Sequence, residues 1–369
     1  MERYLAKQVA KDLERKMVFV GGARQVGKTT LARGLVGAGP GYLNWDVAQD
    51  RESMLKGEFP VAPLLALDEV HKYRDWRGML KGLYDGRVEG QRILVTGSAR
   101  LDWYRFGGDS LQGRYHFLRL HPLSVAELGI AAESAFRDLM VLGGFPEPFL
   151  GGSELEARRW SREYRVRLLQ EDVRDLERVG DLGRMERLML RLPDLVGSPL
   201  SVNALSEDLA VSHRAVSNWI DILERLYAVF RVPPFGTDVI RAVKKAQKHY
   251  HYDWSVVPAE GARFENLVAS QLLKWVHFVQ DTEGRDLELR YVRDVDGREV
   301  DFAIVERTRP LAFVECKLSA REVPSALRYL KEKFPEAEAT LLVAEPVEAR
   351  RTTDGIEIRS AWDYLGRLV

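Results

Sequence analysis

The ten residues from Gly21 to Thr30 constrain the fold of this chain more than any other segment. They read GGARQVGKTT, and from Gly22 onward they match the spacing G-x-x-x-x-G-K-T. The apolar run 17–20 precedes them and a helical pattern over 31–36 follows. Glycine permits a tight turn that aims successive backbone N–H groups at one point, and the positive end of the helix dipole favours an anion there. The sequence therefore predicts a strand, a phosphate-binding loop and a helix in succession.

The loop also predicts which groups hold a nucleotide. Gly22 and Gly27 shape the loop, and Lys28 would reach the β- and γ-phosphates of ATP. Thr29 would bind Mg²⁺, and Thr30 follows it at the start of the helix. A glycine-rich turn before an ordinary helix is the alternative, and the complete motif in its strand–loop–helix context makes it the weaker one.

A second apolar run ends in two carboxylates. Leu64 to Leu67 form a strand pattern, and Asp68 and Glu69 follow directly. Ligands of open α/β sheets bind at the carboxyl ends of the strands. We expect Asp68 to complete the Mg²⁺ shell and Glu69 to polarise the attacking water. After a further strand at 92–97, Ser98 would sense the γ-phosphate, although small polar residues there commonly only form turns.

Length and charge limit the broad class. The 369 residues suffice for two or three domains, and the formal net charge of +0 requires any nucleic-acid site to be a local patch. The single cysteine excludes an internal disulfide framework, and no apolar run reaches the length of a membrane span. We expect a cytoplasmic protein without a membrane partner.

The pattern of elements predicts a multidomain α/β protein. Strands are expected at 17–21, 41–46, 64–68, 92–97 and 115–120, alternating with helices as in a parallel sheet. The pattern becomes helical and strongly charged from about Glu133 to Leu192. We place an ATPase domain over 1–130, a helical lid with a winged-helix-like region over 131–235, and a further α/β domain over 236–369.

Residues 203–226 predict two helices joined by a short turn. Ser212 is a suitable N-cap for the second helix. Its apolar stripe contains Val216, Trp219, Ile220, Leu223 and Leu226. The side chains expected to face outward near its N-terminus, where a recognition helix contacts DNA, are His213, Arg214, Ser217 and Asn218. Acidic residues 207, 208, 221 and 224 would repel phosphates, so DNA and protein contact both remain open.

A basic segment follows this helical pair. It contains Arg241, Lys244, Lys245, Lys248 and His249, with Tyr250, Tyr252 and Trp254 interleaved. Basic and aromatic side chains together are typical of a strip that binds a nucleic-acid backbone. A solvated charge run beside a buried strand is the alternative.

Several motifs together resemble one family. They are the loop at 21–30, Leu-Asp-Glu at 67–69, Thr-Gly-Ser at 96–98, Leu-Gln-Gly-Arg at 111–114, His-Pro-Leu-Ser at 121–124, Gly-Gly-Phe-Pro-Glu at 143–147, His-Tyr-His-Tyr-Asp at 249–253 and Gly-Ala-Arg-Phe-Glu-Asn at 261–266. The chain resembles prokaryotic AAA-superfamily ATPases that end in a C-terminal domain of unknown function. That resemblance implies an ATPase core, a winged-helix region and a restriction-endonuclease-like C-terminal module. It also makes Arg114 a candidate arginine finger.

The C-terminal third contains a motif that the same resemblance makes interpretable. Residues 298–305 and 311–317 have the pattern of a strand hairpin, with Cys316 on the face opposite Glu315 and Lys317. Asp301 and Glu315 match the Mg²⁺ ligands of restriction-endonuclease-like folds, and Lys317 matches the lysine that assists the reaction. Glu265 occupies an earlier helix, as the glutamate of that fold does. A strand with a cross-strand ion pair is the alternative.

These observations lead to three hypotheses of function. The first is an ATPase that acts on DNA as a switch or motor, using ATP and Mg²⁺. The second is an ATP-gated, Mg²⁺-dependent DNA nuclease, and the third is a nucleotide-binding scaffold with an inactive nuclease-like domain. DNA is the expected partner, a protein partner could bind the winged-helix region, and oligomerisation is left open.

Overall fold

A computed structural model describes residues 1–97, 111–173, 181–236, 247–294, 296–319 and 322–369. The chain forms two compact units. Unit 1 comprises Met1–Pro122 with two short pieces, Arg225–Tyr227 and Asp281–Glu283, and unit 2 comprises the rest. Ser98 and the basic residues 241, 244 and 245 lie outside the described residues.

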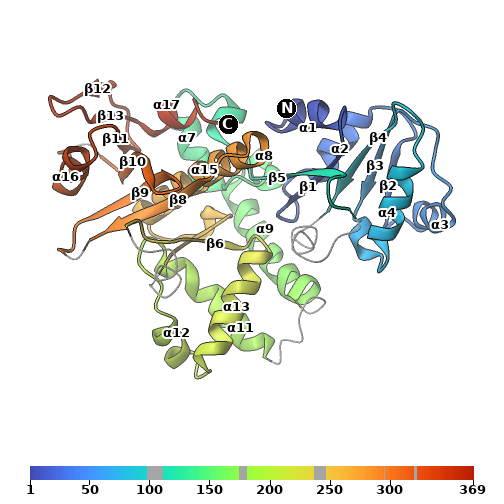
Figure 1. The fold of residues 1–369 in the computed structure, drawn as a ribbon. Helices are drawn as coiled ribbons and strands as arrows, with labels where there is room; N and C mark the ends of the chain where they lie inside the picture. Colours follow the sequence, from blue (N-terminus) through green and yellow to red (C-terminus); the bar gives the residue numbers. More distant parts are fainter. Residues whose placement is uncertain (98–110, 174–180, 237–246, 295, 320–321) are drawn as a thin grey trace. The chain divides into compact units, whose positions relative to one another are not determined.

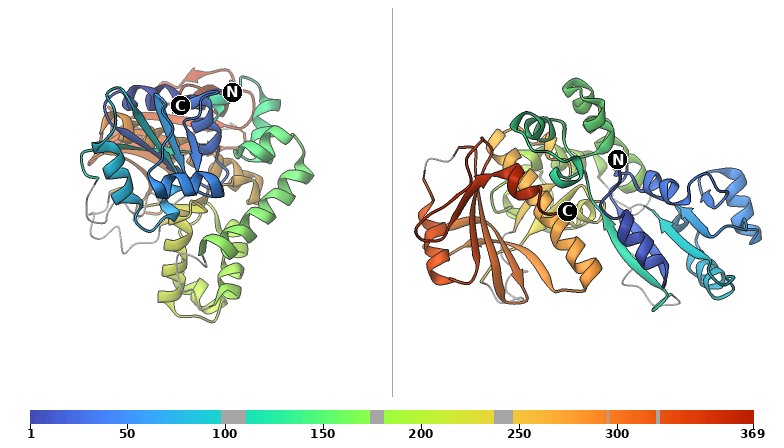
Figure 2. Two further views of the ribbon diagram at one scale, coloured as in Figure 1. Left: turned by 90° about the vertical axis from the view of Figure 1, so that its right-hand side faces the viewer. Right: turned by 90° about the horizontal axis from the view of Figure 1, so that it is seen from above.

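Unit 1 is built on a parallel sheet of five strands. They are β1 (Met17–Gly22), β2 (Tyr42–Asn44), β3 (Leu64–Asp68), β4 (Arg92–Thr96) and β5 (Tyr115–Leu120), in the spatial order β2-β3-β4-β1-β5. Every neighbouring pair is parallel, and the strands run side by side in Figures 1 and 2. All five strands lie where the sequence predicts them. The carboxyl ends of β1, β3 and β4 therefore meet at one edge of the sheet.

Helices connect these strands, as parallel pairing requires. They are α2 (Lys28–Val36), α3 (Ala48–Lys56), the 3₁₀ turn η1 (Val70–Lys72) and α4 (Trp76–Asp85), while α1 (Ala6–Leu13) precedes the first strand. On one face of the sheet, Phe19 and Leu67 pack with Trp76 and Leu80 of α4 in a buried apolar cluster. Burial on this scale holds the strand ends in fixed positions.

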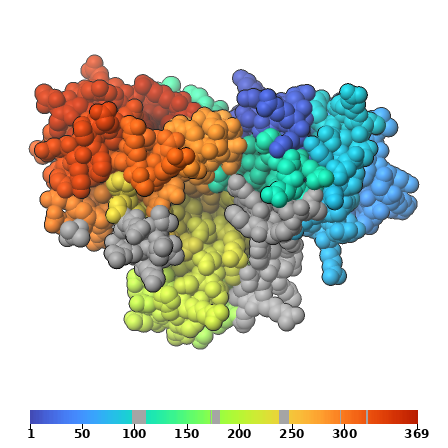
Figure 3. Space-filling view, in the orientation of Figure 1, coloured from blue at the N-terminus to red at the C-terminus, as the bar shows by residue number. Residues whose placement is uncertain are grey.

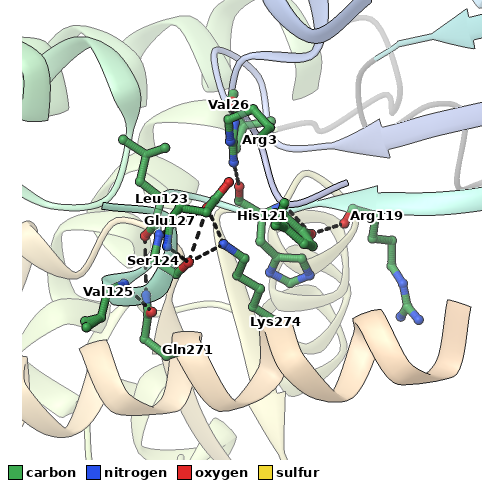
Figure 4. A network of polar contacts seen from close by, with 11 residues as sticks. Arg3, Val26, Arg119, His121, Leu123, Ser124, Val125, Glu127, Gln271 and Lys274 are labelled. Atoms are coloured by element: carbon green, nitrogen blue, oxygen red, sulfur yellow. Dashed lines mark hydrogen bonds and ion pairs between the residues drawn. The ribbon is translucent and has the colours of Figure 1, made fainter. Parts of the chain in front are cut away.

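Unit 2 begins with short helices. They are α6 (Val125–Leu128), α7 (Glu133–Leu142), α8 (Pro146–Gly151), α9 (Glu154–Arg167), the π-helix η3 (Leu168–Val173), α11 (Leu182–Arg191) and the 3₁₀ turn η4 (Leu192–Leu195). Ser124 and Glu127 cap α6 in a reciprocal capping box. Buried Lys274 donates to Ser124 and pairs with Glu127, which attaches α6 to the long helix α15 (Glu260–Glu283) (Figure 4).

The predicted pair of helices is present in unit 2. It consists of α12 (Val202–Asp208) and α13 (His213–Arg225), and the Ser212 hydroxyl accepts a hydrogen bond from the backbone of Ala215. The apolar stripe predicted for the second helix is buried. A two-stranded antiparallel sheet follows, made of β6 (Val229–Val232) and β7 (Lys248–His251). Since these two strands pair, the predicted domain boundary after residue 235 separates two hydrogen-bonded strands.

The C-terminal part of unit 2 contains a six-stranded mixed sheet in the order β12-β13-β11-β10-β9-β8. The strands are β8 (Leu287–Arg293), β9 (Glu299–Glu306), β10 (Arg309–Lys317), β11 (Glu338–Val343), β12 (Arg350–Arg351) and β13 (Glu357–Ser360). Helix α16 (Ser325–Lys333) packs on one face of it through Leu327 and Leu330. The turn η5 (Trp254–Val256) and the terminal helix α17 (Ala361–Leu365) complete the unit. The predicted hairpin is the antiparallel pair β9–β10.

Backbone hydrogen bonds join the β6–β7 hairpin to this sheet. Phe235 donates to the carbonyl of Tyr291 on β8 over 2.7 Å, and Tyr291 donates to the carbonyl of Pro233 over 3.1 Å. The hairpin and the C-terminal sheet are thus continuous within unit 2. No helix among the described residues is both long and apolar enough to cross a membrane.

Candidate functional site

The loop between β1 and α2 has the backbone conformations that its glycines permit. Gly22 has a φ of 144° and Gly27 a φ of 101°, and both values disfavour residues with a side chain. A Cβ atom on Gly22 would lie 2.3 Å from the carbonyl oxygen of Leu120 on the neighbouring strand. Gly27 directly precedes α2, so the first N–H groups of that helix open toward the loop.

An N-terminal arginine that sequence analysis did not single out supports this loop. The Arg3 guanidinium donates to the carbonyl of Val26 in the loop and to the carbonyl of His121 after β5, each over 2.5 Å (Figure 4). Arg3 is buried, so its charge depends on these carbonyl partners. The arginine thereby fixes the loop against the end of β5.

The lysine and threonine predicted to bind nucleotide lie at the same edge of the sheet. Lys28 is buried and donates to the carbonyls of Gly22 and Ala23, at 3.1 and 2.7 Å. The Thr29 hydroxyl donates to Oδ2 of Asp68 over 2.6 Å, although the two residues are 39 positions apart. Thr29 and Thr30 are both exposed at the start of α2. The structure brings together the residues expected to hold Mg²⁺.

Two further hydroxyl groups orient the carboxylate of Asp68. Thr96, at the end of β4, donates to Oδ1 over 2.6 Å, and Tyr42 of β2 donates to Oδ2 over 2.7 Å. The Arg33 guanidinium lies 4.6 Å from the centre of the Tyr42 ring. No local pattern in the sequence places Tyr42 or Thr96 beside Asp68, and only the strand order reveals that they flank it.

Glu69 lies directly beyond the strand in a conformation that is rare for its type. Its φ is 57°, in the left-handed region, where strain commonly marks functional positions. Burial raises the pKa of its carboxyl, while the Lys28 and Lys72 charges oppose that change. Glu69 Oε2 lies 3.4 Å from the Lys72 ammonium and 3.6 Å from Nε2 of buried His71. The carboxylate is held at the site edge and is partly shielded from water.

Arg114 lies at the opposite edge of the sheet. It directly precedes β5, and its carbonyl accepts a hydrogen bond from Met17, the first residue of β1. The loop begins at the other end of β1, about 17 Å away for five residues of strand. Arg114 instead binds Asp85 through two hydrogen bonds of 2.9 and 3.1 Å. It cannot reach a phosphate bound by its own chain, so only a role in a neighbouring chain remains a proposal.

Comparison with known families agrees with this geometry. Residues 14–129 match the family described as AAA domain. This match supports an AAA-type P-loop ATPase domain in the N-terminal part of the chain. Residues 133–263 and 260–364 match two domains of unknown function, DUF8612 and DUF4143. The match to the AAA family suggests nucleotide binding and hydrolysis by this part of the chain.

Relatives of the whole chain carry no assigned activity. An uncharacterised protein of Mycobacterium tuberculosis is 25% identical over 355 residues, which cover 90% of this chain and 77% of that protein. An uncharacterised protein of Haemophilus influenzae is 23% identical over 395 residues, covering 94% and 93%. Among solved structures, the Walker-type ATPase of Pyrococcus abyssi is 15% identical over 70% of this chain and 94% of its own, with a TM-score of 0.42.

The carboxylates predicted in the C-terminal part also converge, but with hydrogen-bond donors between them. The backbone pairing of β9 with β10 ends at Phe302 and Val314. Beyond this pair, carboxylate side chains accept hydrogen bonds from the backbone of the opposite strand. The Asp301 N–H donates to Oε2 of Glu315 over 3.2 Å, and the Cys316 N–H donates to Oδ2 of Asp301 over 2.8 Å. Lys317 pairs with Oε1 of Glu315 at 2.7 Å. Cys316 is buried, as predicted, and burial raises the pKa of its thiol.

A buried lysine of β7 lies among these carboxylates. The Lys248 ammonium is 3.3 Å from Oε1 of Glu265, 2.7 Å from Oε1 of Glu299 and 3.7 Å from Oδ1 of Asp301. Its side chain is only 1% exposed. Burial opposes the charge, yet the surrounding carboxylates raise the pKa of Lys248 above its ordinary value. Burial and the neighbouring Glu265 raise the pKa of Asp301.

These residues do not fit a divalent metal in this arrangement. Within the described ranges, no group of three or more His, Cys, Asp or Glu side chains has the geometry to hold a metal ion. The expected ligands Glu265, Asp301 and Glu315 are instead bonded to ammonium, hydroxyl and backbone N–H groups. We therefore derive no catalytic step through a metal at this cluster.

The basic strip expected around 241–254 is not a surface strip in its described part. Lys248, His249, Tyr250, Tyr252 and Trp254 are all buried. The reason is that β7 pairs with β6 and packs against α15, where Asn266 bonds both the N–H and the carbonyl of His251. The alternation of basic and aromatic residues here belongs to a buried strand whose side chains have internal partners. A surface strip that binds nucleic acid has the same pattern, so a single sequence does not distinguish the buried strand from the surface strip.

The helical pair carries an acidic cluster that has its own counter-ion. Arg231 of β6 lies 2.8 Å from Asp221 and also pairs with Glu224, both on α13. Two of the four carboxylates expected to repel phosphates are thereby paired. His213, Arg214 and Asn218 near the start of α13 are exposed, and atoms of this yellow-green segment lie on the surface in Figure 3.

Proposed function

We propose that the chain is an ATP-hydrolysing switch that acts on DNA. The observation that carries the first part is the 2.6 Å hydrogen bond between Thr29 and Asp68, with Glu69 next along the chain. It supports a Mg²⁺ site at Thr29 and Asp68, the two groups that hold Mg²⁺ in such ATPases, with a neighbouring carboxylate that can act on water. The match to the AAA family supports the same activity.

The proposed roles follow from the positions of the side chains. Lys28 exchanges the carbonyls of Gly22 and Ala23 for the β- and γ-phosphate oxygens of ATP. Mg²⁺ bound to the nucleotide supplies charge neutralisation between the phosphates, and Thr29 and Asp68 are the residues that would hold it. Thr96 and Tyr42 keep the Asp68 carboxylate oriented toward Thr29.

Glu69 orients the water that attacks the γ-phosphate. Burial raises the pKa of its carboxyl, which makes the carboxylate a stronger acceptor for a proton of that water. Lys72 and His71 hold it from the other side, at 3.4 and 3.6 Å. Ser98 remains the proposed γ-phosphate sensor, and its position lies outside the described residues.

We further propose that α12, α13 and the β6–β7 hairpin form a winged-helix-like unit that contacts DNA. Two helices followed by an antiparallel hairpin are the order of elements in such units, and the exposed His213, Arg214 and Asn218 occupy the helix start that faces a groove. Arg231 pairs with Asp221 and Glu224, which reduces the repulsion of phosphates.

The C-terminal sheet is proposed to have a restriction-endonuclease-like fold without metal-dependent cleavage. The support for the fold is that α15 provides Glu265 while the paired strands β9 and β10 provide Asp301, Glu315 and Lys317. Against cleavage stands the Lys248 ammonium among the carboxylates. The proposed protein is thus an ATPase that acts on DNA, as in the first hypothesis, and its nuclease-like domain is inactive, as in the third.

The test is ATP turnover and DNA binding by the full chain, with and without duplex DNA. Arg214→Ala should weaken binding to all DNA sequences and reduce the salt slope of binding by about 1, as expected for loss of one phosphate contact. The control Arg351→Ala removes an arginine whose side chain is 66% exposed on β12. Equal binding by the wild type and Arg214→Ala would assign the helix to a protein partner. Absence of ATP turnover in the wild type would contradict the proposed enzyme.

A further inference from the structure

We infer that Lys248 is the permanent cation of the C-terminal carboxylate cluster and takes the place that a divalent metal would have. The cluster consists of Glu265, Glu299, Asp301 and Glu315, and it lies wholly within unit 2. This inference goes beyond ATP hydrolysis, because it concerns a site that the AAA domain does not contain.

The first support is the position of the ammonium. It lies within 3.7 Å of carboxylates from two elements, Glu265 on α15 and both Glu299 and Asp301 on β9. A side chain that is 1% exposed cannot swing into solvent without opening the surrounding packing. A lysine buried so completely remains charged only where carboxylates surround it.

The second support is that each predicted metal ligand already accepts a hydrogen bond or an ion pair through its carboxylate. Tyr250 donates to Oε1 of Glu265 over 2.7 Å, and the same oxygen is the partner of Lys248. Both oxygens of Asp301 are engaged, Oδ1 by Lys248 and Oδ2 by the backbone of Cys316.

Both carboxylate oxygens of Glu315 also have partners. Its Oε2 accepts from the backbone of Asp301 and its Oε1 pairs with Lys317. A Mg²⁺ ion takes oxygen ligands at about 2.1 Å in near-octahedral geometry, so it would have to displace several of these donors. It would also meet the repulsion of the buried ammonium.

The cluster then has a structural role. Lys248 belongs to β7, and its carboxylate partners belong to α15 and β9, so the ion pairs fix the β6–β7 hairpin to the C-terminal sheet. The same attachment includes the backbone bonds between Tyr291 and the segment Pro233–Phe235. The hairpin of the proposed winged-helix-like unit thus moves together with the C-terminal sheet.

The test uses the full chain without nucleotide and Mn²⁺ as the probe. Binding is measured by calorimetry and thermal unfolding is followed in the same solutions. The wild type and Asp301→Asn should give the same Mn²⁺ isotherm within about twofold, since Asp301 holds no metal. Lys248→Met should gain one Mn²⁺ site, because the converging carboxylates then lack a cation. This site should bind Mn²⁺ at least about tenfold more tightly than the wild-type chain does.

Three comparisons make the result specific. The gained site should disappear in the double variant Lys248→Met, Asp301→Asn, and Mn²⁺ should raise the melting temperature of Lys248→Met alone. Lys317→Met is the matched control, because it removes a lysine that is 49% exposed and pairs with the same cluster, and it should gain no site. Asp68→Asn measures any Mn²⁺ held at the P-loop.

Two results would overturn the inference. One is loss of a wild-type Mn²⁺ site on Asp301→Asn, a measurement that does not require Lys248→Met to fold. The other is a folded Lys248→Met chain that gains no Mn²⁺ site, or gains no more than Lys317→Met. Neither result affects ATP turnover at the P-loop, so failure here is distinguishable from failure of the proposed ATPase.

Discussion

Tyr42 donates to the same carboxylate oxygen of Asp68 that accepts a hydrogen bond from Thr29, at 2.7 and 2.6 Å. The oxygen therefore has two hydroxyl donors, one from β2 and one from α2. Burial and the bond to Asp68 raise the pKa of Tyr42 to about 12, so the hydroxyl keeps its proton near neutral pH. If Thr29 turns its oxygen toward a metal, as proposed, Tyr42 would remain as a donor that holds Asp68.

Tyr42→Phe is expected to weaken the dependence on Mg²⁺ and to leave nucleotide contacts intact. Loss of one hydrogen bond to a charged group, about 1.5–3 kcal/mol, should raise the Mg²⁺ concentration needed for half-maximal turnover by about tenfold or more. Affinity for ATP measured without Mg²⁺ should not change. Tyr84→Phe is the control, since its ring lies under Arg87 on another part of the unit. Equal Mg²⁺ dependence in both variants would remove the positioning role.

Lys28→Ala and Glu69→Gln should separate binding from turnover. Because Lys28 is proposed to contact phosphates in the ground state, Lys28→Ala should abolish ATP binding. Because Glu69 is proposed to act on the attacking water, Glu69→Gln should bind ATP normally and lose turnover by about a hundredfold or more. Fluorescent-nucleotide titration and phosphate release provide the two measurements, with Lys81→Ala, at an exposed lysine of α4, as the control. Wild-type turnover in Glu69→Gln would show that another group orients the water.

Arg114 is proposed to act between chains. Its position at the far edge of the sheet predicts that turnover per chain rises with protein concentration. Mixing Arg114→Ala with Lys28→Ala should restore part of the activity, since each chain supplies what the other lacks. Turnover that is independent of concentration, with no recovery on mixing, would leave Arg114 as the partner of Asp85 alone.

Acid should destabilise unit 2 through two buried histidines. Burial lowers the pKa of His249 to about 4 and that of His251 to about 3. In the unfolded chain both histidines take up a proton near pH 6.5, whereas in the folded chain they stay neutral down to about pH 4. The free energy of unfolding is therefore highest above about pH 6.5 and decreases as the pH falls toward 4. The loss should be on the order of a few kcal/mol.

The variant His251→Leu tests this pH dependence. In the described part of the chain, Nε2 of His251 is buried without a hydrogen-bond partner, so leucine should cost little at pH 8. Denaturant unfolding between pH 8 and 4 should show a shallower loss for the variant. A slope identical to that of the wild type would place the acid sensitivity elsewhere.

Local patterns were sufficient for the elements of the fold and for the P-loop. The five strands of unit 1, the Ser212 cap and the β9–β10 hairpin each depend on periodicity or turn chemistry within a few residues, which a single sequence contains. Lys28, Thr29 and Asp68 could be named because the motif fixes their relation to the strand ends.

Relationships across long stretches of chain were not accessible. Lys248 lies in a basic run and looks like a surface residue until β7 is placed against α15 and β9. Tyr42 becomes part of the site only through the pairing of β2 with β3. Arg114 was named a candidate arginine finger from the family resemblance, which does not give its distance from the loop of its own chain. Each case depends on pairing partners that lie 15 or more residues apart.

The two hydrogen bonds between the Asn266 side chain and the backbone of His251 have a consequence for association between chains. A strand whose N–H and carbonyl groups face outward is a template on which another chain can add a strand. The Asn266 amide satisfies both groups of His251, at 2.8 and 2.7 Å, as a neighbouring strand would. This end of β7 offers no unpaired backbone to a stray strand, so the helix protects the hairpin from edge-to-edge aggregation.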